Sequence, residues 1–86
     1  MDKQSLINAI ENHRKKYKYT SWTVGITNDP SRRKEEHKNS GRQVGLWKDW
    51  KADSEKIARE VEKYFLDKGM KGGGGGGDNP TYVYIF

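Results

Sequence analysis

Apolar and polar residues alternate in two short segments of the chain. Residues 22–27 (WTVGIT) place their large apolar side chains on one face, and residues 81–86 (TYVYIF) place their aromatic side chains on one face. A period of two, with aromatic and β-branched residues, is typical of β-strands. The pattern predicts a half-buried strand within residues 19–27. It also predicts a second strand over residues 81–86 that pairs within the same sheet.

Three helices are predicted from the spacing of apolar residues and from the residues that start and stop helices, over residues 2–16, 30–39 and 53–68. Each has a side chain that can cap its N-terminus: Asp2, Asp29, and either Asp53 or Ser54. Gly41 and Gly69 follow the second and third helices, where a left-handed residue often ends a helix. The element order α-β-α-α-β predicts a single α+β domain over residues 1–86, with a small antiparallel sheet of two or three strands flanked by helices.

Two further segments follow no regular pattern. Residues 42–50 include Trp47 and Trp50, which we expect to fill the small core, the alternative being stacking on nucleic-acid bases. Residues 72–77 are six consecutive glycines. They form either a flexible linker or a tight loop whose backbone passes close to another group. No Gly-Lys-Ser/Thr follows them, so they are not a P-loop.

The composition limits the class of protein. Of the 86 residues 31% are apolar and 34% charged, with a net charge of +5 and no cysteine. The absence of cysteine excludes disulfide and thiolate chemistry and favours a cytoplasmic protein. No apolar run approaches the roughly 20 residues of a membrane-spanning helix, so no membrane partner is expected. The positive charge favours a polyanionic partner such as nucleic acid, the alternative being a lysine-rich surface that is merely solvated.

The basic side chains fall into two groups on the predicted helices. The first group, at the C-terminal end of the first helix, is Lys15, Lys16 and Lys18. The second group, on the second helix, is Arg32, Lys34 and Lys38. Cations at the end of a helix interact favourably with the helix dipole, which would explain the first group without any ligand. Alternatively, both groups contact the phosphates of a nucleic acid.

Three other charged residues are candidates for a chemical role. Arg33 and His37 are four residues apart, so they project from one side of the second helix. Glu62 falls inside the apolar sector of the third helix, whereas Glu60 lies on its charged side. A carboxylate in an apolar sector is costly unless it is paired or binds a cation. The plainer interpretations are solvated charges for Arg33 and His37, and pairing with a neighbouring lysine or arginine for Glu62.

Together these residues resemble the GIY-YIG nuclease domain. Gly25 in the strand is followed eight residues later by Arg33 and twelve residues later by His37, and Ala58 precedes Glu62 by four, spacings that match the family. The sequence departs from the family pattern at Thr23, where a tyrosine is expected, and the first family strand is missing. The resemblance covers residues 22–79.

The resemblance implies a site for phosphodiester hydrolysis. Glu62 would hold Mg²⁺ or Mn²⁺, Arg33 would bind the phosphate, and His37 or a tyrosine would orient or deprotonate the attacking water. Asn79 would be the counterpart of the family's asparagine. Tyr82 or Tyr84 would replace the missing tyrosine, as in a permuted version of the sheet.

Two functions therefore follow from the sequence. The first is a divalent-metal-dependent endonuclease, with DNA favoured over RNA as its substrate. The second is a degenerate relative that binds nucleic acid or a protein partner without cutting. A nuclease core this small would also need a protein partner, a homodimer or low specificity.

Overall fold

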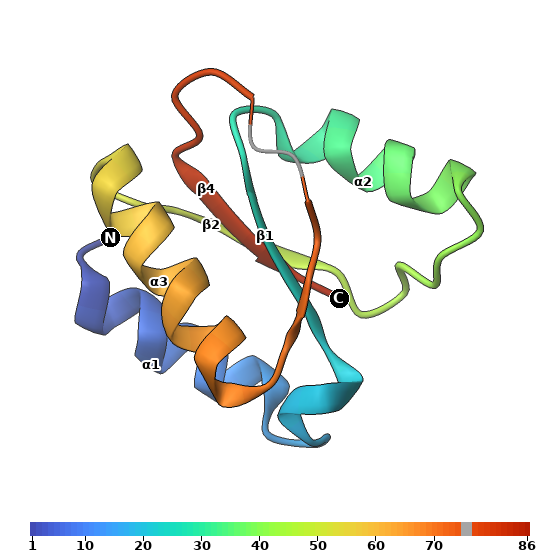
Figure 1. Ribbon diagram of the computed structural model, residues 1–86, viewed down its shortest axis with the longest axis horizontal. Helices are drawn as coiled ribbons and strands as arrows, with labels where there is room; N and C mark the ends of the chain where they lie inside the picture. The colour runs from blue at the N-terminus through green and yellow to red at the C-terminus, as the bar shows by residue number, and fades with distance from the viewer. Residues whose placement is uncertain (75–76) are drawn as a thin grey trace.

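Four strands form one mixed sheet in the computed structural model, which describes residues 1–74 and 77–86 (Figure 1). The strands are β1 (Thr23–Thr27), β2 (Lys48–Lys51), β3 (Lys71–Gly72) and β4 (Tyr82–Ile85), arranged in the order β2-β4-β1-β3. β4 lies in the middle and runs antiparallel to β1 and β2, whereas β3 runs parallel to β1. The C-terminal strand therefore sits between two strands that come from earlier in the chain.

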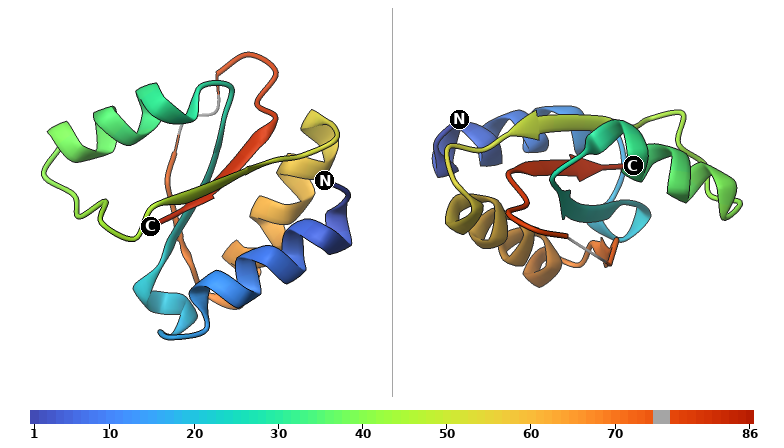
Figure 2. Two further views of the ribbon diagram at one scale, coloured as in Figure 1. Left: turned by 180° about the vertical axis from the view of Figure 1, so that it is seen from behind. Right: turned by 90° about the horizontal axis from the view of Figure 1, so that it is seen from above.

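The three predicted helices are present as α1 (Lys3–Arg14), α2 (Pro30–Asn39) and α3 (Glu55–Lys68). Their N-caps are Asp2, Asp29 and Ser54, each of which accepts a hydrogen bond from a backbone N–H of the first turn. α1 and α3 lie side by side on one face of the sheet, and α2 lies on the other (Figure 2). The result is an α+β fold with helices on both faces.

The main core lies between the sheet and the α1–α3 pair. The inward side chains of β1 and β4 are Val24, Ile26, Val83 and Ile85, all at most 1% exposed. They pack against the buried faces of the two helices, made by Leu6, Ile7, Ile10, Ala58, Val61 and Phe65. These positions follow the period of two in the strands and the helical period in α1 and α3, as the sequence pattern indicates.

A second, aromatic cluster covers the opposite face of the sheet. Trp47 stacks on Tyr84 with ring centroids 4.4 Å apart, and His37 of α2 lies 4.6 Å from the ring of Phe86. The expectation that Trp47 fills the main core is therefore wrong, whereas Trp50 does pack against that core. Because both faces are covered, all five residues of β1 are buried and the strand is not half-buried as predicted.

The predicted sheet of two or three antiparallel strands is also wrong. β2 (KDWK) has one apolar residue and pairs at the sheet edge, so no alternation marks it. β3 enters the glycine run and pairs with β1 in parallel, which no sequence pattern indicates. The first strand begins at Thr23, because Tyr19–Ser21 form a 3₁₀ turn. The first helix ends at Arg14, before the lysine cluster.

The cap of α3 allows a direct test of the fold. Ser54 Oγ accepts a hydrogen bond of 3.2 Å from the backbone N–H of Ile57. Ser54→Ala should lower the free energy of unfolding by about 1 kcal/mol, because it leaves a helix N–H without its partner. Ser31→Ala on α2 is the matched control, since Ser31 is exposed and is not the cap of that helix. Urea unfolding measures both, and equal losses would contradict the assignment of the cap.

Candidate functional site

The strand register places Tyr84 directly opposite Gly25, on the α2 face of the sheet. The phenol ring then lies across β1 toward the neighbouring glycine segment. A Cβ atom on Gly25 would lie 2.3 Å from the Tyr84 hydroxyl, and one on Gly73 would lie 2.5 Å from it. Real Cβ atoms do not approach other atoms this closely, so both positions require glycine while the ring stays in place.

Gly73 is held in this position by the backbone of β1. Its N–H donates a 2.7 Å hydrogen bond to the carbonyl of Val24, which continues the pairing of β3 with β1. The described part of the glycine run thus behaves as the close-approach loop, which is one of the two alternatives that the sequence left open. Residues 75 and 76 of the run lie outside the described residues.

Arg33 and His37 of α2 both reach the hydroxyl of Tyr84. Arg33 Nε donates to it at 3.3 Å, and His37 Nε2 lies 2.9 Å from it. An arginine can only donate, so the Tyr84 oxygen accepts from Arg33. The bond to His37 runs from the Tyr84 hydroxyl to Nε2 in the neutral tautomer protonated on Nδ1, and from Nε2 to the Tyr84 oxygen in the tautomer protonated on Nε2.

The other donors of Arg33 are paired within the protein. Nη2 donates to the carbonyls of Gly73, at 2.5 Å, and Gly74, at 3.1 Å, and Nη1 donates to Glu36 at 3.1 Å. Burial alone would lower the pKa of Arg33, but the hydrogen bonds to Tyr84 and Glu36 outweigh it and raise that pKa. Arg33 therefore stays charged and ties α2 to the glycine segment.

Burial controls the protonation of the other two groups. It raises the pKa of Tyr84, and the negative charge of Glu62 acts in the same direction, while Arg33 opposes both. Burial also lowers the pKa of His37, and the positive charges of Arg33 and Arg42 lower it further. A neutral His37 beside a protonated Tyr84 is consistent with the hydrogen bond between them.

Glu62 lies on α3, on the face of the sheet opposite to α2 and the Tyr84 hydroxyl. It lies one helical turn before Leu66, whose Cδ2 would be 3.7 Å from a Cβ on Gly72. Burial raises the pKa of Glu62, and its charge influences Tyr84. Among the described residues its carboxylate has neither a hydrogen-bond nor an ion-pair partner, so the pairing interpretation is wrong. The Glu62 carboxylate is therefore available to a ligand.

These residues fit a divalent cation only in a limited way. Within residues 1–74 and 77–86, no group of three or more His, Cys, Asp or Glu side chains could hold a metal ion. Mg²⁺ commonly binds through one or two carboxylates and takes its remaining ligands from water and substrate phosphates. The unpartnered Glu62 carboxylate fits only this arrangement, in which one protein carboxylate binds the ion and water and phosphate supply the other ligands.

Two further candidates lie away from the Tyr84 hydroxyl. Tyr82 pairs with Thr27 and Lys51, and its ring lies 5.9 Å from the Lys51 ammonium. Asn79 is exposed in the turn before β4, with a φ of 49°. This left-handed conformation explains why the position is an asparagine, because asparagine tolerates it better than most residues do. In the described chain, neither side chain hydrogen-bonds to Arg33, His37 or Tyr84.

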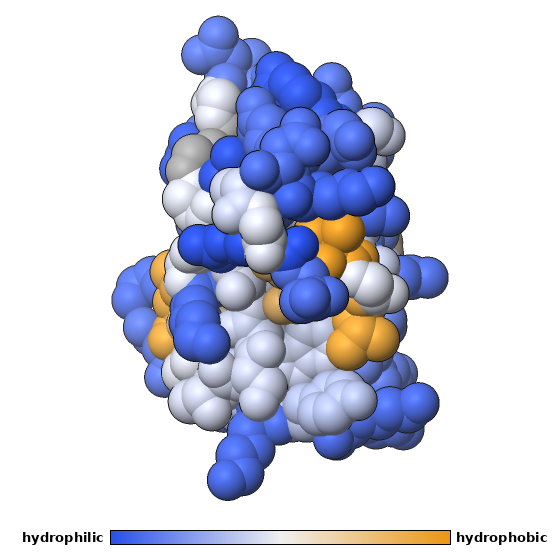
Figure 3. Space-filling view, turned by 90° about the vertical axis from the view of Figure 1, so that its right-hand side faces the viewer, coloured by the Kyte–Doolittle hydropathy of each residue, from blue (hydrophilic) through white to orange (hydrophobic). Residues whose placement is uncertain are grey.

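The predicted basic groups lie in different places. Arg32, Lys34 and Lys38 are exposed on α2, where hydrophilic side chains gather over the upper part of this face (Figure 3). Lys15 and Lys16 instead line a hollow at the end of α1, together with Tyr17 and Trp22. Lys18 is exposed next to the 3₁₀ turn. The groups therefore do not form one continuous patch with Arg33.

Three contributors to the site were missed from the sequence. Gly73 is indistinguishable from its neighbours in a run of six glycines. Trp47 belongs to a segment without periodicity, although it stacks on Tyr84. Arg42 follows α2 and looks like a loop residue, although its charge lowers the pKa of His37. Only strand register and tertiary packing identify these residues.

Comparison of the chain with known protein families, with curated proteins and with solved structures finds no match in any of the three. Each helix in the described part of the chain is too short or too polar to cross a lipid bilayer.

The contact between Gly25 and Tyr84 predicts a specific cost of substitution. Gly25→Ala should lower the free energy of unfolding by about 1–3 kcal/mol, because the new methyl group overlaps the phenol. The cost should shrink in a Tyr84→Ala background, which removes the ring. Gly45→Ala is the control, since no atom lies within 4 Å of a Cβ there. Urea unfolding of the four variants measures the coupling, and additive losses would contradict the contact.

The environment of His37 predicts its titration. The pKa of His37 should lie below 6.5, and Arg42→Gln should raise it by removing a nearby positive charge. Lys56→Gln on the exposed side of α3 should leave it unchanged. An NMR titration of the imidazole ring measures all three proteins, and an unchanged His37 pKa in Arg42→Gln would contradict this account.

The same shift predicts how stability depends on pH. Because folding lowers the pKa of His37, its contribution to stability is present above pH 6.5 and is lost as the pH falls through the folded pKa. His37→Gln should therefore lose less stability on acidification than the native chain. Glu62 is present in both proteins, so its opposite contribution cancels in the comparison. Identical pH slopes in urea unfolding would count against the assignment.

Proposed function

We propose that this chain is a divalent-metal-dependent endonuclease of GIY-YIG type that hydrolyses phosphodiester bonds, with DNA favoured over RNA. The observation that carries the proposal is the meeting of Arg33 and His37 at the hydroxyl of Tyr84. The three residues come from two elements separated by about half of the chain. Two of them were expected from family spacing, and the third is a tyrosine that replaces the one missing at position 23.

Tyr84 and His37 would handle the proton of the attacking water. His37 Nε2 accepts the phenol proton, and the hydrogen bond from Arg33 stabilises the phenolate that remains. The phenolate would then take a proton from water, whose oxygen forms the new bond to phosphorus as the bond to the leaving oxygen breaks, and the proton held by His37 would pass to that leaving oxygen. The lowered pKa of His37 limits this transfer, so the phenolate would be a transient species.

Arg33 would bind the phosphate through its fork of donors. Its Nη1 pairs with Glu36, whose side chain is 49% exposed, so a phosphate oxygen can replace this carboxylate from the solvent side. Planar guanidinium groups bind phosphate oxygens in pairs, which fixes the orientation of the reacting group. The bonds to Gly73 and Gly74 would hold the guanidinium in place during this exchange.

Glu62 would be the protein ligand of Mg²⁺ or Mn²⁺. A bound divalent cation supplies Lewis-acid stabilisation of the charge that develops on the phosphate and on the leaving oxygen. The support for this role is the unpartnered carboxylate whose charge acts on Tyr84. Neutralisation by a cation would also remove the cost of holding this charge in a partly buried position.

A second candidate, a module that binds nucleic acid or a protein partner without cutting, is favoured by a different observation. Tyr84 is fully buried, and each of the three guanidinium nitrogens of Arg33 already donates a hydrogen bond inside the protein. Such pairing stabilises the fold without any catalytic role. The exposed cations of α2 would then supply salt-dependent attraction to phosphates. In either case we propose a cytoplasmic protein, because a chain without cysteine suits a reducing compartment.

Cleavage of DNA tests the proposal. Purified protein with Mg²⁺ or Mn²⁺ should cut plasmid or single-stranded DNA, and Tyr84→Phe should lower the rate by about 10²–10⁴-fold. Tyr82→Phe is the matched control, because it removes a hydroxyl from the same strand and the same face without touching Arg33 or His37. Rates are compared by gel electrophoresis at equal concentrations of folded protein.

Glu62→Gln should abolish the stimulation by the metal while leaving the protein folded. Binding without cleavage by the native chain would favour the second candidate. Equal losses in Tyr84→Phe and Tyr82→Phe, or full cleavage by Glu62→Gln, would refute the assigned roles.

A further inference from the structure

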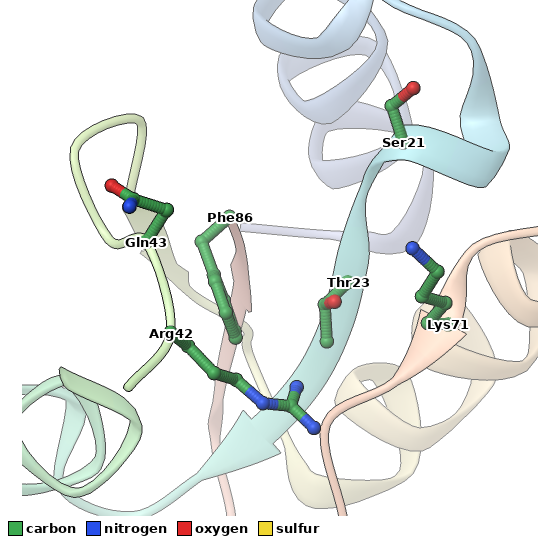
Figure 4. Close-up of a pocket in the computed structure, with 6 residues that line it drawn as sticks. All are labelled: Ser21, Thr23, Arg42, Gln43, Lys71 and Phe86. Atoms are coloured by element: carbon green, nitrogen blue, oxygen red, sulfur yellow. The ribbon is translucent and has the colours of Figure 1, made fainter. Parts of the chain in front are cut away.

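A basic pocket lies beside the Tyr84 site on the same face of the sheet. It has a volume of about 310 Å³ and is lined by Ser21, Thr23, Arg42, Gln43, Lys71 and Phe86. Figure 4 shows the side chains of Arg42 and Lys71 on either side of Thr23, with the Phe86 ring next to Arg42. The two cations thus come from separate elements, the loop after α2 and the edge strand β3.

The lining of this pocket is suited to an anion. It contains two cations, two hydroxyl groups and an amide, and no acidic side chain. In the described residues neither Arg42 nor Lys71 forms an ion pair. Two positive charges on one pocket repel each other, and an anion between them removes this cost. By contrast, the hollow formed by Lys3, Glu60, Lys63, Tyr64 and Asp67 mixes both signs and has no such preference.

The strand register fixes the position of the pocket relative to Tyr84. Thr23 precedes Gly25 by two residues on β1, and Lys71 precedes Gly73 by two on the neighbouring segment. Phe86 follows Tyr84 by two, just beyond the end of β4, and its backbone pairs with that of Thr23. Two residues along a strand keep the same face and span about 7 Å. The pocket therefore lies one such two-residue step from the Tyr84 site on three adjacent segments. This distance is similar to one repeat of a nucleic-acid backbone.

A second observation, which does not depend on the strand register, links the pocket to the Tyr84 site electrostatically. The charge of Arg42 acts on both His37 and Tyr84, although Arg42 hydrogen-bonds to neither side chain. Its guanidinium lies 5.9 Å from the centre of the Phe86 ring, and that ring lies beside His37. Arg42 thus links the pocket to the hydrogen-bonded centre.

We infer that this pocket binds a second phosphate of the same nucleic-acid strand, adjacent to the phosphate held by Arg33. Lys71 and Arg42 supply the charge, and Thr23, Ser21 and Gln43 supply neutral hydrogen-bonding groups. The inference rests on the proposed function, because it assumes a polynucleotide at the Tyr84 site. It adds a direction to that site, because the bound nucleic-acid strand would run from the glycine segment toward the C-terminal end of β4.

Binding of a fluorescein-labelled DNA oligonucleotide without divalent cation tests the pocket separately from cleavage. Lys71→Gln should weaken binding and lower the slope of log Kd against log salt by about one, because one phosphate contact is lost. Lys48→Gln is the matched control: it removes the same charge from an exposed strand position at the opposite edge of the sheet. Its slope should remain that of the native chain.

Oligonucleotides with one neutral methylphosphonate linkage locate the contacts. In the native chain two adjacent linkages should be sensitive to neutralisation, and in a variant carrying both Arg42→Gln and Lys71→Gln only one should remain so. A single sensitive linkage in the native chain, or equal slopes for Lys71→Gln and Lys48→Gln, would overturn the inference while binding itself still supports the proposed function. No binding by the native chain would overturn both.

Discussion

The passage of the Tyr84 phenol across two glycines is the constraint on which the rest of the site depends. The ring begins on the central strand β4 and crosses β1 at Gly25, and its hydroxyl reaches Gly73. A side chain at either glycine would displace the ring, because interiors pack too densely to absorb a methyl group without strain. This crossing moves the hydroxyl from the middle of the sheet to its β3 edge, where it meets Arg33 and His37 of α2. The short, parallel β3 strand has its place in the fold for the same reason, because it brings Gly73 to that edge.

A buried hydroxyl surrounded by charged groups is stable only because each polar atom has a partner. Tyr84 accepts from Arg33 and shares a hydrogen bond with His37, and Arg33 satisfies two carbonyls of the glycine segment. Each bond is worth only about 1 kcal/mol net, but leaving a buried partner unpaired costs about 1–3 kcal/mol. Glu62 is the exception, since its carboxylate has no hydrogen-bond or ion-pair partner among the described residues, and burial raises its pKa against the opposing charge of Arg59. This partly compensated charge lies on α3, on the other face of the sheet from Arg33 and His37.

The helices and the strands β1 and β4 could be predicted from the sequence because their evidence is local. Caps such as Asp29, the stripe of α3 and the alternation of β4 need no knowledge of distant residues. The spacing of Arg33 and His37 likewise places both on one side of α2, where they contact the Tyr84 hydroxyl. β2 and β3 could not be predicted, because edge strands with one or no apolar residue are specified by their partners. For the same reason the choice of Tyr84 over Tyr82 depended on which residue faces Gly25, and strand register alone decides it.

On the proposed function, a substrate would have to replace the same bonds that stabilise the free protein. A phosphate at Arg33 would compete with Glu36, and a water at Tyr84 would have to reach a hydroxyl that is covered by Gly73 and Arg33. A phosphate on the exposed side of the guanidinium exchanges one carboxylate for another anion, so the net cost in electrostatic energy is small. Access to Tyr84 is more demanding, because it requires the glycine segment to separate from the phenol while Arg33 stays charged and in place. On this proposal, binding and cleavage would make different demands on one structure, and the pocket at Arg42 and Lys71 would bear on the difference. A nucleic-acid strand anchored there would lose part of its conformational entropy before it reaches Tyr84, which would leave more of its interaction with Arg33 free to open the site.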